Sequence, residues 1–280
     1  MRKGFFLLTL LLATLTSAQE RIYGKSDSIF VTSLLTKYSA TASIGEQLLS
    51  IAKEFTGHKY VAGTLDTHSN EPLVISTTAV DCTTFVEYVL AIHITINEGK
   101  NNFDDFCRSL ETIRYRNGIR NGYASRLHYI SQWAADSAKK EFLEEVTQAS
   151  PHHKCILKLN YMSCHPASYR QLRESPQLVN EIARWEEPFR TKEIAYIPKD
   201  FLRKEKGDLQ INDGDIIALT TNIEGLDVVH IGFAFWEKEE LRILHASSAE
   251  GKVMKENRSL HLYQKEKKSH TGIRVFRVKK

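Results

Sequence analysis

Residues 228–247 read VVHIGFAFWEKEELRILHAS, and this stretch decides the fold that we predict for the chain. Two apolar, β-rich runs flank the charged pair Lys238 and Glu239, which is the pattern of a β-hairpin with a short turn. If those two residues form the turn, Glu237 pairs with Glu240 and the rest of the register follows.

The register predicts where the two histidines of the hairpin lie. His230 falls opposite Ser247, and His245 falls opposite Gly232, so the histidines become diagonal neighbours on one face of the sheet. Gly232 has no side chain and leaves room on that face. A loop of odd length would instead place the two histidines on opposite faces, because side chains alternate along a strand.

Working outward, the last third of the chain is rich in strand patterns and the first third in helical ones. Short apolar segments bounded by Gly, Asn or charged residues occur at 215–220, 228–235, 241–247 and 273–278. Apolar residues recur at helical spacing within 19–56, and a second helix is predicted from Cys82 to about Glu98. We therefore expect an α+β fold in which N-terminal helices, including the Cys82 helix, pack on an antiparallel β-sheet.

The segment at about 103–195 is charged and is predicted to be a helical and loop-like insertion. No internal repeat or low-complexity linker is visible on either side of it. We therefore expect residues 19–280 to form a single domain, which is a size that can bury a sizeable core.

The N-terminus has the layout of a secretory signal peptide over residues 1–18: a basic start, an apolar run and small residues before the cleavage point. A buried helix or an uncleaved anchor is the alternative. Cleavage would remove Arg2 and Lys3 and lower the formal net charge of +4 by two. We expect an exported, periplasmic or extracellular protein without stable membrane insertion, and the weak charge argues against nucleic acid as a partner.

Cys82 is the candidate nucleophile. Asp81 stands where an N-cap residue belongs, so Cys82 would open the helix that follows. Unpaired N–H groups and the helix dipole favour a thiolate there, and the same N–H groups can stabilise an oxyanion. The alternative is a small buried hydrophobic residue, which is the commoner use of a free cysteine.

The two histidines of the hairpin supply a candidate base. His230 can accept the proton of Cys82, and His245 can orient the His230 ring as the third member of a triad. A single histidine on a strand is usually structural, but two on one face with a helix-capping cysteine elsewhere favour catalysis.

These residues carry a resemblance to a known superfamily. The chain resembles the NlpC-type branch of papain-like cysteine peptidases in the order of these residues: Cys82 on a helix, then His230 and His245 on successive strands. Gly214-Asp215, which precedes the first of these strands, belongs to the same pattern. Tyr60 resembles the tyrosine that precedes the nucleophile in that branch. The resemblance implies a papain-like core and a substrate contact for Tyr60.

Longer strings narrow the resemblance to the N-acetylmuramoyl-L-alanine amidase-like proteins. These strings are DCTTFVE from Asp81, SRLHY at 125–129, YIP at 196–198 and GLD at 225–227. The resemblance implies hydrolysis of the amide between muramic acid and L-alanine in peptidoglycan fragments, which are the expected partners, through a thioester and without a cofactor.

Several further roles are expected. Arg126, Tyr129 and Asp81 are candidate substrate contacts, since a guanidinium can bind a carboxylate and an aromatic ring can pack on a sugar. No metal site is expected, because the His and Cys residues between 152 and 165 fit no standard zinc spacing. Cys155 and Cys164 are the likeliest disulfide pair by proximity.

Three alternatives to the amidase stay open at this point. A γ-D-glutamyl-diamino acid endopeptidase would use the same catalytic residues. A non-catalytic wall-binding protein would need none of them, and acyl transfer to an amine would pass through the same thioester.

Overall fold

The predicted hairpin is present in the computed structural model, which describes residues 20–40 and 43–279. Strands β9 (Val228–Glu237) and β10 (Glu240–Ser247) pair antiparallel, with Glu237 opposite Glu240 and Phe233 opposite Leu244. The predicted register is confirmed over these pairs. The predicted signal peptide at 1–18 lies outside the described residues.

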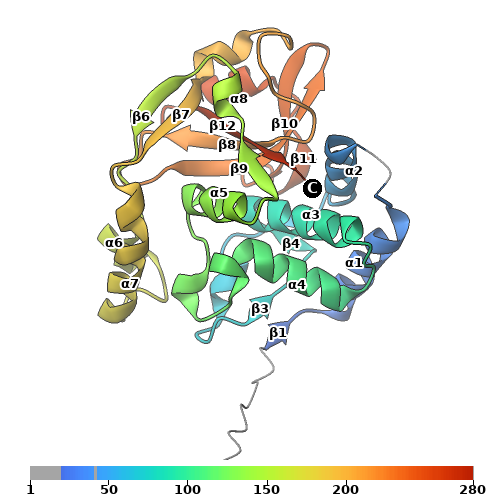
Figure 1. Cartoon of the computed structure of the whole chain (residues 1–280), viewed down its shortest axis with the longest axis vertical. Coiled ribbons are helices and arrows are strands. Elements are labelled where there is room, and N and C mark those ends of the chain that lie inside the picture. Colours follow the sequence, from blue (N-terminus) through green and yellow to red (C-terminus); the bar gives the residue numbers. More distant parts are fainter. Residues whose placement is uncertain (1–19, 41–42, 280) are drawn as a thin grey trace, which may run out of the picture.

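The hairpin lies in the middle of one large sheet of ten strands within the described residues (Figure 1). The order is β4-β2-β11-β10-β9-β8-β12-β7-β6, and β5 adds to β12. The remaining strands of this sheet are β2 (Lys59–Tyr60), β4 (Ala79–Val80), β5 (Leu143–Glu145), β6 (His153–Ile156), β7 (Glu193–Pro198), β8 (Ile216–Thr221), β11 (Lys252–Lys255) and β12 (His270–Val278).

The expectation of a purely antiparallel sheet is wrong at one edge. β2 pairs parallel with β4, and a separate two-stranded sheet pairs β1 (Arg21–Ile22) parallel with β3 (Leu73–Val74). Each of these strands has only two residues, which is too short for an alternation of apolar and polar residues to predict the strand from the sequence. The fold is therefore α+β with a mixed sheet.

The helices begin and end close to where cap chemistry places them. The predicted helical region at 19–56 is two helices, and the helix at Cys82 forms as predicted and ends at Asn97. The helices are α1 (Lys25–Lys37), α2 (Ile44–Glu54), α3 (Cys82–Asn97), α4 (Phe103–Arg114), α5 (Ile130–Lys139), α6 (Tyr161–Cys164), α7 (Pro176–Glu186) and α8 (Leu260–Lys265).

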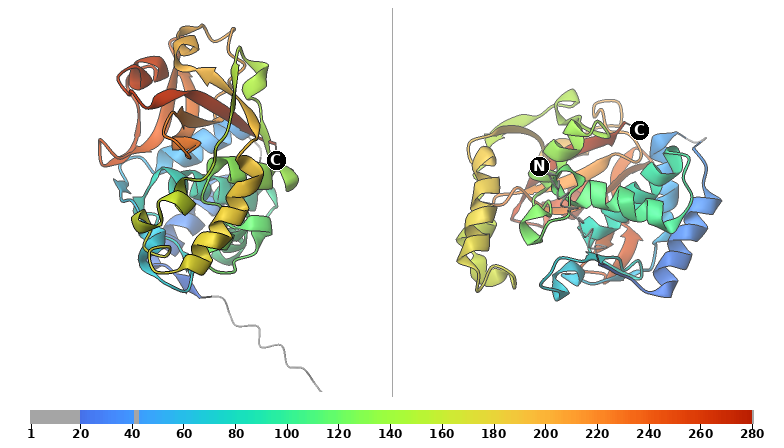
Figure 2. Two further views of the ribbon diagram at one scale, coloured as in Figure 1. Left: turned by 90° about the vertical axis from the view of Figure 1, so that its left-hand side faces the viewer. Right: turned by 60° about the horizontal axis from the view of Figure 1, so that its bottom comes forward.

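The segment at 103–195 is only in part the helical and loop-like insertion that we expected. Helix α4 packs along α3 and belongs to the main core, while strands β5, β6 and the start of β7 extend the sheet. The four residues of β6 are all exposed, so the strand lacks the apolar alternation that sequence reasoning requires. Helices α6 and α7 form a lobe beside the sheet (Figure 2).

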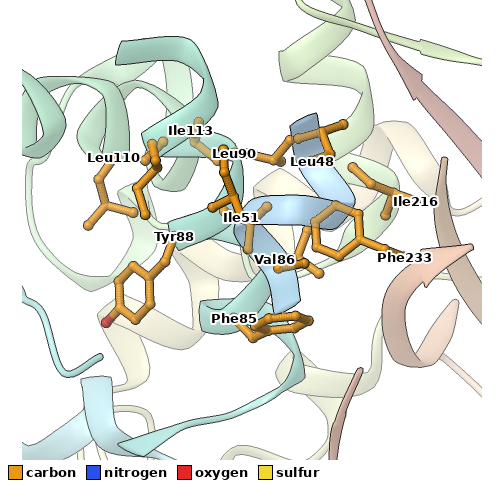
Figure 3. Close-up of a cluster of buried hydrophobic side chains, with 14 of the residues drawn as sticks. Leu48, Ile51, Phe85, Val86, Tyr88, Leu90, Leu110, Ile113, Ile216 and Phe233 are labelled. Carbon is orange, nitrogen blue, oxygen red and sulfur yellow. The ribbon is translucent and has the colours of Figure 1, made fainter. Parts of the chain in front are cut away.

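Two cores lie on the two faces of the sheet. The larger one joins α2, α3 and α4 to the inner faces of β8 and β9, where Phe85 meets Phe233 edge to face with ring centroids 5.7 Å apart (Figure 3). The other face carries a second core that contains Leu241, Ile243 and Leu260 of α8. The sheet is thus covered on both sides, and the N-terminus of α3 comes to lie against β9.

The turn of the hairpin has unfavourable residues for its conformation. Lys238 and Glu239 have φ angles of 51° and 62°, a pair of positive values that a two-residue hairpin turn commonly takes and that Asn-Gly fits best. We predict that the double variant Lys238→Asn/Glu239→Gly is more stable than the parent by about 1 kcal/mol, because it relieves backbone strain at both positions. Thermal and guanidinium unfolding measure this, and an unchanged or lower midpoint would contradict it.

Candidate functional site

Cys82 is the first residue of α3, and its position is fixed by Asp81. The Asp81 carboxylate accepts a hydrogen bond of 2.8 Å from the Thr84 N–H, and the Thr84 hydroxyl accepts one of 2.9 Å from the Asp81 N–H. This reciprocal cap satisfies one N–H of the first turn. The N–H of Cys82 takes no part in the cap and points to its own sulfur.

The sulfur of Cys82 lies against strand β9. The N–H of Ile231, the Thr83 hydroxyl and the Cys82 N–H all bond to it and favour the thiolate. Burial outweighs them and, together with the Asp81 carboxylate, raises the pKa of Cys82 to about 11. Cys82 is therefore a partly buried, protonated thiol at neutral pH, and it needs a base to become a nucleophile.

The two histidines of the hairpin touch each other. Nε2 of His230 and Nδ1 of His245 are 2.6 Å apart, and the rings are nearly perpendicular at 83°. Gly232 makes room for this contact, since a Cβ there would lie 2.9 Å from the His245 Cβ and 2.7 Å from the Leu244 carbonyl oxygen. Ile231, whose N–H reaches the Cys82 sulfur, is the residue after His230, so the thiol lies beside the segment that carries the first imidazole.

Both imidazoles are neutral at physiological pH. Burial, helped by His245, lowers the pKa of His230 to about 3. Burial also lowers the pKa of His245 to about 4, although Glu256 opposes the change. The site therefore holds a neutral thiol and two neutral imidazoles. Among the described hydrogen bonds, none joins the Cys82 sulfur to either ring.

Two tyrosines flank the thiol. Burial raises the pKa of Tyr60 to about 12, and negative charge on Cys82 adds to the rise, so the structure brings Tyr60 of β2 to the predicted nucleophile. Burial raises the pKa of Tyr263 of α8, and negative charge on Glu256 and Cys82 adds to the rise; its ring lies edge-on to His245, with centroids 5.5 Å apart. Sequence reasoning missed Tyr263, because a six-residue helix shows no clear periodicity.

Arg126 is engaged inside the protein. Its guanidinium makes two hydrogen bonds of 2.8 Å to the Glu71 carboxylate and one of 2.8 Å to Asp66, and the residue is 8% exposed. These contacts tie 123–126 to the segment that follows Tyr60. The arrangement is a structural ion pair, and the predicted substrate contact of Arg126 has no support in it.

Tyr129 has an internal role as well. Its hydroxyl donates to Glu186 at 2.7 Å and accepts from the Met162 N–H at 2.7 Å, so the ring anchors the α6–α7 lobe. Glu186 is fully buried and also binds Ser163. With Tyr129 only 3% exposed, its predicted sugar contact likewise has no support in the structure. Asp81 uses its carboxylate as a helix cap, and its predicted substrate contact stays a prediction.

The structure also bears on the suggested disulfide, on metal binding and on membrane-spanning helices. Cys155 on β6 and Cys164 at the end of α6 are exposed free thiols, so the suggested disulfide is not formed. Within residues 20–40 and 43–279, no group of three or more His, Cys, Asp or Glu side chains could hold a metal. In the same residues no helix is both long and apolar enough to cross a membrane.

A family comparison agrees with this geometry. The family model described as N-acetylmuramoyl-L-alanine amidase-like matches residues 50–273, which include Cys82, His230 and His245. The chain belongs to this family. The predicted resemblance is thereby confirmed at the level of the family. No curated protein matches the chain.

Solved structures extend the comparison. The chain is 42% identical to an N-acetylmuramoyl-L-alanine amidase from Bacteroides uniformis, with 85% of this chain and 100% of that chain covered and a TM-score of 0.80. It is 47% identical to a candidate xylanase from Bacteroides fragilis over 82% of this chain and 100% of that one, with a TM-score of 0.76. A Legionella pneumophila protein at 23% identity, with a TM-score of 0.67 over 90% of this chain and 94% of that one, shares the fold.

The buried neutral histidines make stability depend on pH. Burial lowers the pKa of His128 from 6.5 to about 3. Between pH 3 and pH 6.5 this histidine is therefore protonated in the unfolded chain and neutral in the folded chain. Stability from this residue is complete above pH 6.5 and is lost as the pH falls. We predict that His128→Gln shows a smaller loss of unfolding free energy between pH 7 and pH 4 than the parent.

Guanidinium unfolding at several pH values measures this difference. His165→Gln is the matched control, since that histidine is exposed, and its pH dependence should equal that of the parent. An identical pH dependence for His128→Gln and the parent would show that His128 is not held neutral.

Proposed function

We propose that the chain is an N-acetylmuramoyl-L-alanine amidase in which Cys82 is the nucleophile, His230 the base and His245 the residue that orients the base. One observation carries the proposal: two imidazoles on adjacent strands are in 2.6 Å contact, and the first lies on β9, the strand whose backbone touches the sulfur at a helix N-terminus. Membership of the amidase-like family supports the reaction class.

The first half of the reaction forms a thioester. Nε2 of His230 faces His245, so Nδ1 of His230 is the nitrogen that remains for the thiol proton. As the proton leaves, the sulfur of Cys82 attacks the lactyl carbonyl carbon of the muramic acid. The N–H of Cys82, at the N-terminus of α3, donates to the oxygen that becomes negative.

The second half releases both products. The His230 imidazolium gives its proton to the nitrogen of L-alanine, and the C–N bond breaks to leave a peptide with a free amine. His230 then takes a proton from water, which attacks the thioester carbonyl, and the thiol regains its proton as the muramic acid departs with a free carboxylate. Atoms balance as amide plus water giving acid plus amine, and no cofactor takes part.

We expect short, soluble wall fragments to be the substrate and the protein to act after export. Support comes from the two structural ties around the site. Arg126 holds the segment after Tyr60 in place, and Tyr129 holds the α6–α7 lobe. We expect these two held segments to border the site and to favour a small ligand. The N-terminal layout at 1–18 supports export.

Two rival functions are less well supported. The endopeptidase that cuts after D-glutamate would use the same thiol and imidazoles, and the name of the Bacteroides uniformis relative favours the amidase over it. Glycoside cleavage, suggested by the name of the Bacteroides fragilis relative, ordinarily needs a pair of carboxylates across the bond. Among the described groups that shift the pKa of Cys82, the only carboxylate is Asp81, which caps α3.

We predict that Cys82→Ala lowers turnover of a muropeptide by at least about a thousandfold, because the attacking atom is lost. The melting temperature should be unchanged, since the cap at Asp81 does not involve the thiol. Cys155→Ala is the matched control at an exposed free thiol and should keep full turnover. If Cys82→Ala turned over the muropeptide at the parental rate, the proposed mechanism would be wrong.

We predict that the muramic acid to L-alanine amide is cut ahead of the D-glutamyl bond. The experiment incubates purified protein with a disaccharide-tetrapeptide and weighs the products by mass spectrometry. Free disaccharide with intact tetrapeptide is the expected result. Disaccharide-dipeptide with a dipeptide that starts at the diamino acid would establish the endopeptidase instead.

A further inference from the structure

Nε2, the second ring nitrogen of His245, has no hydrogen-bond partner in the site. For His230 to accept the thiol proton on Nδ1, its Nε2 must carry hydrogen and donate to Nδ1 of His245. His245 must then carry its own hydrogen on Nε2. That Nε2 is buried and has no hydrogen-bond partner, and the residue is fully buried. A buried donor of this kind is costly unless negative charge lies near it.

Glu256 supplies negative charge on the correct side. His245 pairs with Met254 across β10 and β11, and Glu256, two residues further on, shares the face of Met254. The Glu256 N–H donates to the Ile243 carbonyl, which holds the chain beside β10. Glu256 is therefore a diagonal neighbour of His245, and it is 6% exposed.

The Glu256 carboxylate is held in place by one arginine. Arg258 donates its backbone N–H and its Nε to one carboxylate oxygen, both at 3.0 Å, and its Nη2 to the other at 3.1 Å. The Arg258 side chain is 46% exposed, whereas the Glu256 side chain is 7% exposed. The negative end of this pair thus faces the interior and the positive end faces solvent.

The other titratable groups around the histidine pair do not replace Glu256. Negative charge on Glu256 raises the pKa of His245 and positive charge on Arg258 lowers it, while Tyr263 lies edge-on to the ring as a neutral phenol. His270 and Lys267 act on His230 and lower its pKa. Among these described groups, Glu256 is the one that favours a positive charge on the imidazole pair.

We propose that Glu256 is a positioning residue that fixes His245 in the tautomer able to accept a hydrogen bond from His230. The inference rests on the proposed function, because it concerns the same thiol and base. When His230 takes the proton of Cys82, positive charge spreads to His245 through their short contact, and Glu256 stabilises it. A histidine in the third position is neutral and cannot do this alone.

The test uses the full chain with Glu256→Gln, which keeps the shape and removes the charge. We expect kcat to fall about tenfold with KM unchanged, and the acid limb of the kcat/KM profile to move to lower pH, because loss of the carboxylate lowers the pKa of the imidazole pair. Glu256→Asp should recover most of the loss. Glu266→Gln is the matched control, since Glu266 pairs with Arg258 at 3.6 Å from the solvent side, and it should behave as the parent.

A second measurement does not depend on the substrate. Nitrogen-15 spectra of the histidine side chains should show His245 with hydrogen on Nε2 alone in the parent, and a mixture of tautomers in Glu256→Gln. The same single tautomer in both proteins, or equal changes in Glu266→Gln, would overturn the inference. If the parent cuts no muropeptide while the tautomers differ as expected, the proposed function fails and the positioning role stands.

Discussion

The site depends on the register of one hairpin. The 2.6 Å contact between the two imidazoles exists only because Glu237 pairs with Glu240, since a shift of one residue would turn His245 to the other face of the sheet. The same register brings a glycine against the second ring, where any side chain would collide. Cores on both faces of the sheet hold the hairpin in place, so packing far from the thiol maintains the geometry of the histidine pair.

Burial decides the electrostatic state that this geometry produces. A thiol and two imidazoles removed from water all favour their neutral forms, so no ion pair forms between Cys82 and the two histidines. A neutral site costs less desolvation than a buried ion pair. In the mechanism that we propose, stabilisation must therefore act on charge that appears during reaction, and the N–H groups at the start of α3 would contribute there.

The parts of the molecule that were predictable are those with local signals. Two apolar, β-rich runs around a charged pair predicted β9 and β10, and a cap residue predicted the start of α3. The roles of Arg126 and Tyr129 were not predictable, because their partners Glu71 and Glu186 are 55 and 57 residues away along the chain. The sequence around an arginine beside aromatic residues does not show whether the guanidinium binds a ligand or forms an internal ion pair. The two-residue strands and the exposed strand β6 were not predicted, because their sequences show no alternation of apolar and polar residues.

The structure engages both of those side chains in internal contacts, and their predicted contact with substrate stays a prediction. Arg126 is one of several buried arginines that join distant segments, as Arg114 does when it donates to Glu87 at 2.7 Å and to the Val74 carbonyl at 2.8 Å. Removing one partner of such a pair leaves an uncompensated buried charge, which costs about 3–5 kcal/mol. These pairs therefore hold the segments that they join, among them the one that follows Tyr60, in a fixed conformation.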